Sequence, residues 1–153
     1  MGRVSGLLVV LRTGLGFADE LVGKLNRFFA SVVSAVDARG GLVNKFQGDA
    51  ALCVFGAPTR LADSETSGLL AARAISDSVR EAAELDLGIG VACGPVFAGQ
   101  LDTRSRLEYT VMGDAVNEAT RLTEHAKKVL GRILASEAAV ADASAAERDL
   151  WTP

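Results

Sequence analysis

The segment GLVNKFQGDAALCVFGAP, residues 41–58, contains two apolar runs joined through a Gly-Asp pair. Residues 42–47 and 50–55 have the length and composition of strands, and only Gly48 and Asp49 separate them. Two-residue loops of this composition are typical of tight hairpin turns, because glycine adopts positive φ without strain. The segment therefore predicts a β-hairpin with a carboxylate at its tip.

Two charged residues of this hairpin admit two interpretations. A carboxylate at the tip is exposed enough to bind a divalent cation, and hard oxygen ligands such as that of Asp49 suit Mg²⁺. In that case Lys45 would lie at a fixed distance from the bound cation. Alternatively, Asp49 only forms the turn and Lys45 is a solvated charge on a strand. The hairpin alone favours this second interpretation.

Helical and strand-like segments alternate on either side of the hairpin. Apolar residues recur at helical spacing over 19–39 and again over 64–84, and Gly40 or Gly41 is placed to end the first helix. Residues 87–101, LGIGVACGPVFAGQL, are β-like but rich in glycine, which predicts a bulge or a close backbone approach. The remaining predicted elements are strands at 7–11, 107–113 and 132–135, a helix at 114–128 and a final helix. This alternation predicts an α/β or α+β fold with a mixed sheet.

Composition limits the class of protein. The chain has 153 residues, 49% hydrophobic and 23% charged, which predicts a single globular domain over residues 1–153. A net charge of -3 gives no indication of nucleic-acid binding. Cys53 and Cys93 lie in separate apolar runs and are expected to be buried thiols in a reducing compartment. The apolar run Leu7 to Leu11 is far too short to span a membrane, so we expect a cytoplasmic protein without a membrane anchor.

A second polar pair lies in YTVMGDAVNEATR, residues 109–121. Asn117 and Arg121 are four residues apart on the predicted helix and therefore share one face. An amide beside a guanidinium can bind ribose and phosphate oxygens, with arginine as a planar donor to developing charge. Taken alone, such a pair is more often an ordinary solvated face.

Three segments together resemble the catalytic domain of class III nucleotidyl cyclases, the adenylyl and guanylyl cyclases. NKFQGDAALCVFGAP, LGIGVACGPVFAG and YTVMGDAVNEATRL are similar to three successive motifs of that family, in order and at fitting spacing. The resemblance is strongest over residues 18–140 and is closest to the bacterial adenylyl type, in which threonine replaces an aspartate that reads the base. It implies an α+β fold, with a ferredoxin-like βαββαβ palm, a mixed sheet and the outline of an α/β sandwich.

The resemblance also implies roles for particular residues. Lys45 would donate to a ring nitrogen of adenine, and Thr110 would read the adenine amino group. Asp49 would be one of two aspartates that hold Mg²⁺ or Mn²⁺. Asn117 would orient the ribose, and Arg121 would stabilise the transition state at the α-phosphate. The reaction implied is the conversion of ATP to cyclic AMP and pyrophosphate in signal transduction, by a homodimer or a heterodimer with another cyclase chain, whose sites span both chains.

The N-terminal segment departs from the family pattern. The first strand of the family ends in the other metal-binding aspartate; counting back from Asp49 by the family spacing reaches Ser5, and no acidic residue precedes Asp19. The family also continues beyond the equivalent of Pro153 into a strand with a lysine that contacts the triphosphate. We therefore expect a chain truncated at both ends, with the first strand altered or missing.

Three interpretations of activity follow from these departures. The chain is an adenylyl cyclase, weakened as a homodimer because half of its metal ligands are absent. Alternatively, it is a catalytically inactive remnant that binds nucleotide or dimerises, pairing with an intact cyclase to which it donates Lys45, Thr110, Asn117 and Arg121. The third interpretation is an unstable fragment with an incomplete sheet.

Overall fold

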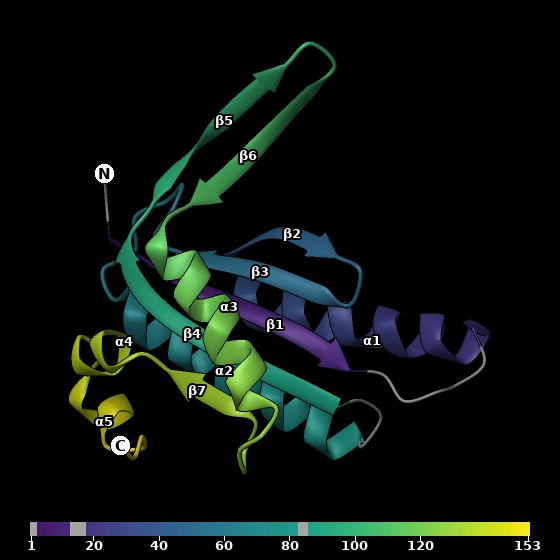
Figure 1. Cartoon of the computed structure of the whole chain (residues 1–153). Coiled ribbons are helices and arrows are strands. Elements are labelled where there is room, and N and C mark those ends of the chain that lie inside the picture. The colour runs from purple at the N-terminus through teal and green to yellow at the C-terminus, as the bar shows by residue number, and fades with distance from the viewer. Residues whose placement is uncertain (1–2, 13–17, 83–85) are drawn as a thin grey trace.

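The computed structural model describes residues 3–12, 18–82 and 86–153. Five strands form one mixed sheet in the order β2-β3-β1-β4-β7, and two further strands form a separate hairpin that projects from it (Figure 1). The strands are β1 Arg3–Arg12, β2 Leu42–Gln47, β3 Ala50–Phe55, β4 Asp86–Pro95, β5 Phe97–Thr103, β6 Arg106–Met112 and β7 Ile133–Ala135. The helices are α1 Ala18–Asp37, α2 Ser64–Ala82, α3 Asp114–Ala126, α4 Glu137–Ala141 and α5 Ala145–Arg148.

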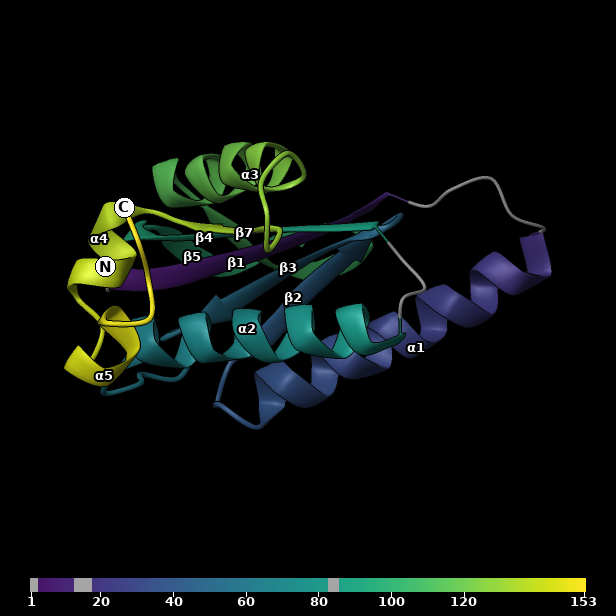
Figure 2. The ribbon, with the colours of Figure 1, turned by 90° about the horizontal axis from the view of Figure 1, so that it is seen from below.

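The order of the first elements is βαββαβ, as the resemblance implied. β1 pairs antiparallel with both β3 and β4, β2 pairs antiparallel with β3, and β7 adds a parallel strand beside β4. Helices α1 and α2 cover one face of the sheet, and α3 covers the other (Figure 2). The α+β class with a ferredoxin-like core and a mixed sheet is confirmed.

The strand expected to be altered or missing is present. β1 extends the predicted strand at 7–11 in both directions and lies at the centre of the sheet, hydrogen-bonded on both edges. A central strand leaves no open edge inside the sheet, so the described part of the fold has the connected core that an incomplete sheet would lack. The alteration lies in the sequence of β1, which carries no acidic residue.

β4 explains why its segment is rich in glycine. Its larger residues Leu87, Ile89, Val91 and Cys93 belong to the main core under α1 and α2, whereas the alternate positions are glycine or alanine and face α3. A Cβ built on Gly90 would lie 2.2 Å from the backbone oxygen of Ala119 on α3. The predicted close backbone approach is confirmed, and it allows α3 to pack directly on the strand.

Three predicted features can be compared with the structure. Gly40, with φ of 71°, ends the first helix in the left-handed conformation, so Gly40 rather than Gly41 is the capping residue. Both cysteines are buried thiols, as predicted. The predicted final helix is two short helices, α4 and α5, because Ser144 caps a new helix by accepting a hydrogen bond from the backbone N–H of Glu147. No helix in the described part of the chain is long and apolar enough to cross a membrane.

Candidate nucleotide and metal site

Asp49 lies at the exposed tip of the β2–β3 hairpin. Only Gly48 and Asp49 separate the two strands, and Gly48 has φ of 57°, so the predicted turn is confirmed. The strand register places Val10 of β1 opposite Ala50, directly after the tip, whereas Ser5 lies opposite Phe55 at the other end of the pairing. The end of β1 beside Asp49 is therefore Val10 to Arg12, not Ser5, and it contains no carboxylate.

Lys45 lies beside an irregularity in β2. Val43 pairs with Cys53 and Lys45 pairs with Leu52, so Asn44 is an extra residue in the ladder, a β-bulge. The Nζ atom of Lys45 lies 3.5 Å from an Oε1 oxygen of Glu108 on β6. The bulge thus directs Lys45 toward the projecting β5–β6 hairpin.

The side chain of Asn44 joins the same two strands. Its Nδ2 donates a 2.7 Å hydrogen bond to the backbone oxygen of Tyr109 on β6, while its buried Oδ1 has no partner among the described residues. Thr110 follows Tyr109 in the chain and is 8% exposed. The structure therefore places Lys45 and Thr110 on two strands that are tied together at one junction.

Asn44 and Glu108 are residues that sequence reasoning missed. A weak signal existed for each. Asparagine is disfavoured inside strands, so Asn44 within an otherwise strand-like run could have marked a bulge. Glu108 is two residues before Thr110 on a strand, and alternate strand residues share a face.

Asn117 and Arg121 lie on the outer side of α3. Both are exposed, one helical turn apart, as their spacing predicted. The opposite side of α3 packs on the sheet through small residues, which are Ala115, Ala119, Thr123 and Ala126. The close approach to β4 thus holds the helix firmly while leaving the amide and the guanidinium accessible.

The five candidate residues do not form one cluster within the chain. Lys45 and Thr110 lie on the two strands of the β2–β6 junction, Asp49 lies at the hairpin tip, and the other two residues lie on α3. Within the described residues, no hydrogen bond or ion pair links Asp49 to the other four. A single chain therefore presents the five candidate residues in separate places.

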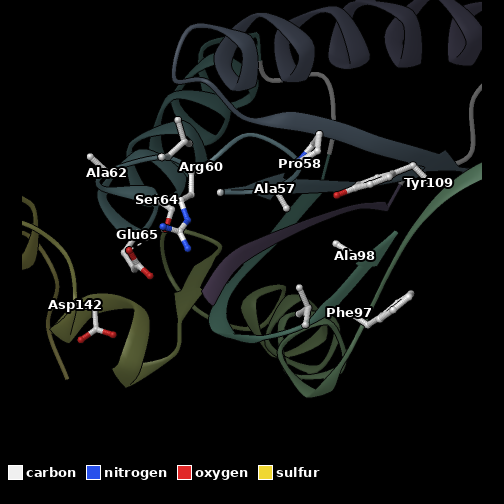
Figure 3. Close-up of a pocket in the computed structure, with 13 residues that line it drawn as sticks. Ala57, Pro58, Arg60, Ala62, Ser64, Glu65, Phe97, Ala98, Tyr109 and Asp142 are labelled. Carbon is white, nitrogen blue, oxygen red and sulfur yellow. Dashed lines mark hydrogen bonds between the residues drawn. The ribbon is translucent and has the colours of Figure 1, made fainter. Parts of the chain in front are cut away.

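A cavity of about 1140 Å³ lies near the base of the β5–β6 hairpin (Figure 3). Tyr109, Phe97 and Pro58 line its apolar side, and it includes none of the five candidate residues. Glu65 and Asp142 line its charged side, and one ligand atom from each lies within 4.8 Å of the other and of the Cys93 sulfur. Both Cys93 and Asp142 take part in further interactions of the chain.

Comparisons with known proteins agree with this architecture. Residues 12–147 match the family model for the adenylate and guanylate cyclase catalytic domain. An uncharacterized protein of Mycobacterium tuberculosis is 54% identical over 134 residues, which are 87% of this chain and 25% of that protein. The chain thus spans about a quarter of the length of the curated relatives it matches.

Solved structures share the fold. The guanylyl cyclase Cya2 is 28% identical with a TM-score of 0.75, and the match covers 94% of this chain and 79% of that one. A bacterial light-regulated adenylyl cyclase is 21% identical with a TM-score of 0.77, covering 90% of this chain and 77% of that one. The family match covers all five candidate residues, and it begins at Arg12, the last residue of β1. The chain belongs to the adenylate and guanylate cyclase catalytic domain family.

Proposed function

We propose that this chain acts on ATP as an adenylyl-type cyclase domain, forming cyclic AMP and pyrophosphate in cyclic-nucleotide signalling. The observation that carries the proposal is the junction between β2 and β6, where Lys45 and Thr110 lie on strands joined by a side-chain hydrogen bond. An amine and a hydroxyl at one junction offer a donor for a ring nitrogen and an acceptor for an amino group, which is what adenine requires.

The sugar and phosphates would be bound by α3. Asn117 would form hydrogen bonds with the ribose, as donor and as acceptor, and so orient its 3′-oxygen. Arg121 would stabilise the negative charge that develops as this oxygen attacks the α-phosphorus. The 3′-hydroxyl gives up its proton to water, the bond from the α-phosphorus to the bridging oxygen breaks, and its electron pair leaves with pyrophosphate. Both side chains are exposed on one helix face, which supports a role toward a ligand or a second chain.

The donor set of this chain fits one divalent cation rather than two. Mg²⁺ is commonly held by one or two carboxylates together with substrate phosphates, so Asp49 with the triphosphate would suffice for one Mg²⁺ or Mn²⁺. A bound cation would neutralise phosphate charge. The adjacent end of β1 offers no second carboxylate, and the chain alone does not fit a cradle for two metals. We therefore expect turnover by a homodimer to be weak.

A second candidate function is favoured by this missing carboxylate. In it, the chain donates Lys45, Thr110, Asn117 and Arg121 to a partner cyclase chain that supplies both metal-binding acids. The β5–β6 hairpin supports contact with a partner chain, because it projects from the sheet (Figure 1) and exposes apolar side chains. These are Phe97, Leu101, Leu107 and Met112. Exposed apolar surface of this kind is typical of protein interfaces.

A cyclic AMP assay with Mn²⁺ and ATP tests the proposal and separates the two candidates. Turnover by the purified chain that Lys45→Ala abolishes supports the first. Turnover only after mixing with a cyclase that lacks its own asparagine and arginine at the matching positions supports the second. Absence of activity in both assays, together with no binding of ATP, would contradict both.

The partner surface can be tested separately by sedimentation. Leu107→Glu on the hairpin should shift the chain toward the monomer. Leu130→Glu is the matched control, because Leu130 is fully exposed on another part of the molecule. An equal effect of the two substitutions would argue against the hairpin as the interface.

A further inference from the structure

The bulge in β2 has a consequence for its two central side chains. Residues of a regular strand alternate between the faces of a sheet. The extra residue interrupts this alternation, and both Asn44 and Lys45 reach β6, the first to the Tyr109 backbone and the second to Glu108. Without the extra residue, neighbouring side chains of β2 would point to opposite faces.

The two contacts differ in how firmly they hold β6 against β2. The Lys45–Glu108 pair is long, and the two side chains are 29% and 56% exposed, so water and salt screen it. The hydrogen bond from Asn44 is short and part-buried, and it ends on a backbone atom. Since β5 and β6 form a sheet of their own, this bond ties that hairpin to the main sheet one residue before Thr110.

We propose that Asn44 is a positioning residue for base recognition: its hydrogen bond to Tyr109 holds β6 against β2 so that Lys45 and Thr110 contact the same purine. The inference rests on the proposed function and deepens it, because it assigns base selectivity to a residue that does not touch the base. Asn44 is not a catalytic residue in this scheme.

The second polar atom of the Asn44 side chain, Oδ1, bears on what this residue contributes to stability. Its Oδ1 is buried without a partner among the described residues, which disfavours the folded state. Asparagine is also a poor strand former, whereas valine is a good one. Valine would remove the orphan oxygen and suit a strand, but it would also leave the Tyr109 backbone oxygen without this donor, so we expect a small net effect on stability. A residue with little net effect on stability that ties two strands together is expected to affect ligand binding more than folding.

The test compares ligand binding and stability in the same variants. Asn44→Val removes the amide, and Asn44→Asp keeps its shape but removes the donor. Asn26→Val is the matched control, because Asn26 is an exposed asparagine on α1. Binding of ATP and GTP in the presence of Mn²⁺ is measured by calorimetric titration of the full chain, and thermal unfolding is recorded without nucleotide.

For both Asn44 variants we expect ATP to bind about five- to tenfold more weakly, the effect of one lost hydrogen bond, with a smaller preference for ATP over GTP. The unfolding midpoint of Asn44→Val should change little, because loss of the orphan oxygen offsets loss of the hydrogen bond. Unaltered affinity and preference in both variants would overturn the positioning role. So would a loss of affinity that merely follows a lower unfolding midpoint.

Nucleotide binding by the unmodified chain distinguishes failure of the positioning role from failure of the proposed function. Normal ATP binding by the unmodified chain, unaffected by either Asn44 substitution, overturns the positioning role and leaves the proposed function standing. Failure of the unmodified chain to bind either nucleotide overturns the proposed function, and base positioning by Asn44 with it.

Discussion

Lys45 on β2 and Glu108 on β6 face each other across the junction, with Nζ 3.5 Å from Oε1. Both side chains are partly exposed, so the pair is screened and contributes little to stability. Glu108 therefore holds the amine near β6 without locking it there. A purine that enters the junction would exchange a weak carboxylate contact for a hydrogen bond to Lys45.

Replacing the carboxylate should therefore favour the nucleotide. Glu108→Gln removes the competing charge, and we expect ATP to bind about two- to fivefold more tightly, corresponding to less than ~1 kcal/mol for an exposed pair. Titration at low and high salt measures the effect, which should shrink as salt screens the pair. Glu137→Gln, an exposed acid on α4, controls for the change in net charge. Equal gains in the two variants would show that Glu108 does not compete for Lys45.

Asp49 should determine the metal dependence of nucleotide binding. Asp49→Asn removes the charged ligand at the hairpin tip while keeping its shape, and we expect the Mn²⁺ enhancement of ATP binding to fall about tenfold, roughly 1.4 kcal/mol. Titrating Mn²⁺ into the chain with ATP measures this. Asp102→Asn, an exposed acid on β5, is the control. If Asp49→Asn leaves the metal dependence unchanged, Asp49 only forms the turn and binds no cation.

Thr110 should discriminate between bases only modestly. A hydroxyl both donates and accepts, so it can adapt to adenine or guanine. We expect Thr110→Ala to reduce the preference for ATP over GTP by about two- to fivefold, near the ~1 kcal/mol of one hydrogen bond. Competitive titration with the two nucleotides measures the ratio. A complete switch to GTP would contradict the proposed weak reading by this hydroxyl.

The sequence predicted the local parts of this site well. The hairpin bounds at residues 42–47 and 50–55 agree with the structure, because a two-residue Gly-Asp turn between two apolar runs determines where one strand ends and the next begins. The one-face arrangement of Asn117 and Arg121 also follows from helical spacing alone. Both features depend on residues close together in the chain.

The junction itself could not be predicted in the same way. The contact from Asn44 to Tyr109 joins residues 65 positions apart, and it depends on a bulge that shifts the register by one residue. Likewise, glycines in β4 indicated a close approach, but not that α3 would be the element approaching. Such relationships are set by tertiary packing, which a single sequence does not display.

Cys53 gives a pH-dependent prediction. Burial raises the pKa of its thiol from 9.0 to about 12, so the folded chain keeps the proton at pH values where the unfolded chain loses it. The resulting contribution to the free energy of unfolding is full below about pH 9 and is lost as the pH rises toward 12. Urea titrations over this range should give a steeper loss for the unmodified chain than for Cys53→Ala. Parallel pH profiles would contradict the burial effect.

The packing of α3 on β4 gives a prediction in which the same change, glycine to alanine, has opposite effects on stability at Gly90 and at Gly23. A Cβ on Gly90 would lie 2.2 Å from the oxygen of Ala119 and 2.6 Å from the nitrogen of Thr123, both backbone atoms of α3. We expect Gly90→Ala to lower the free energy of unfolding by about 1–3 kcal/mol, as overpacking does, and to displace the helix that carries Arg121. Complementation of a partner cyclase should therefore fall further than the loss of folded protein explains.

Gly23 in α1 provides the matched control for this substitution. A Cβ there would come no closer than 3.6 Å to Nη1 of Arg27, and alanine is favoured over glycine inside a helix. We expect Gly23→Ala to raise the free energy of unfolding by roughly 0.5–1 kcal/mol and to leave complementation unchanged. Urea unfolding of both variants measures the contrast. Equal stability of Gly90→Ala and Gly23→Ala would show that α3 has room to shift on β4. The close contact between α3 and β4 would then not explain the position of Arg121.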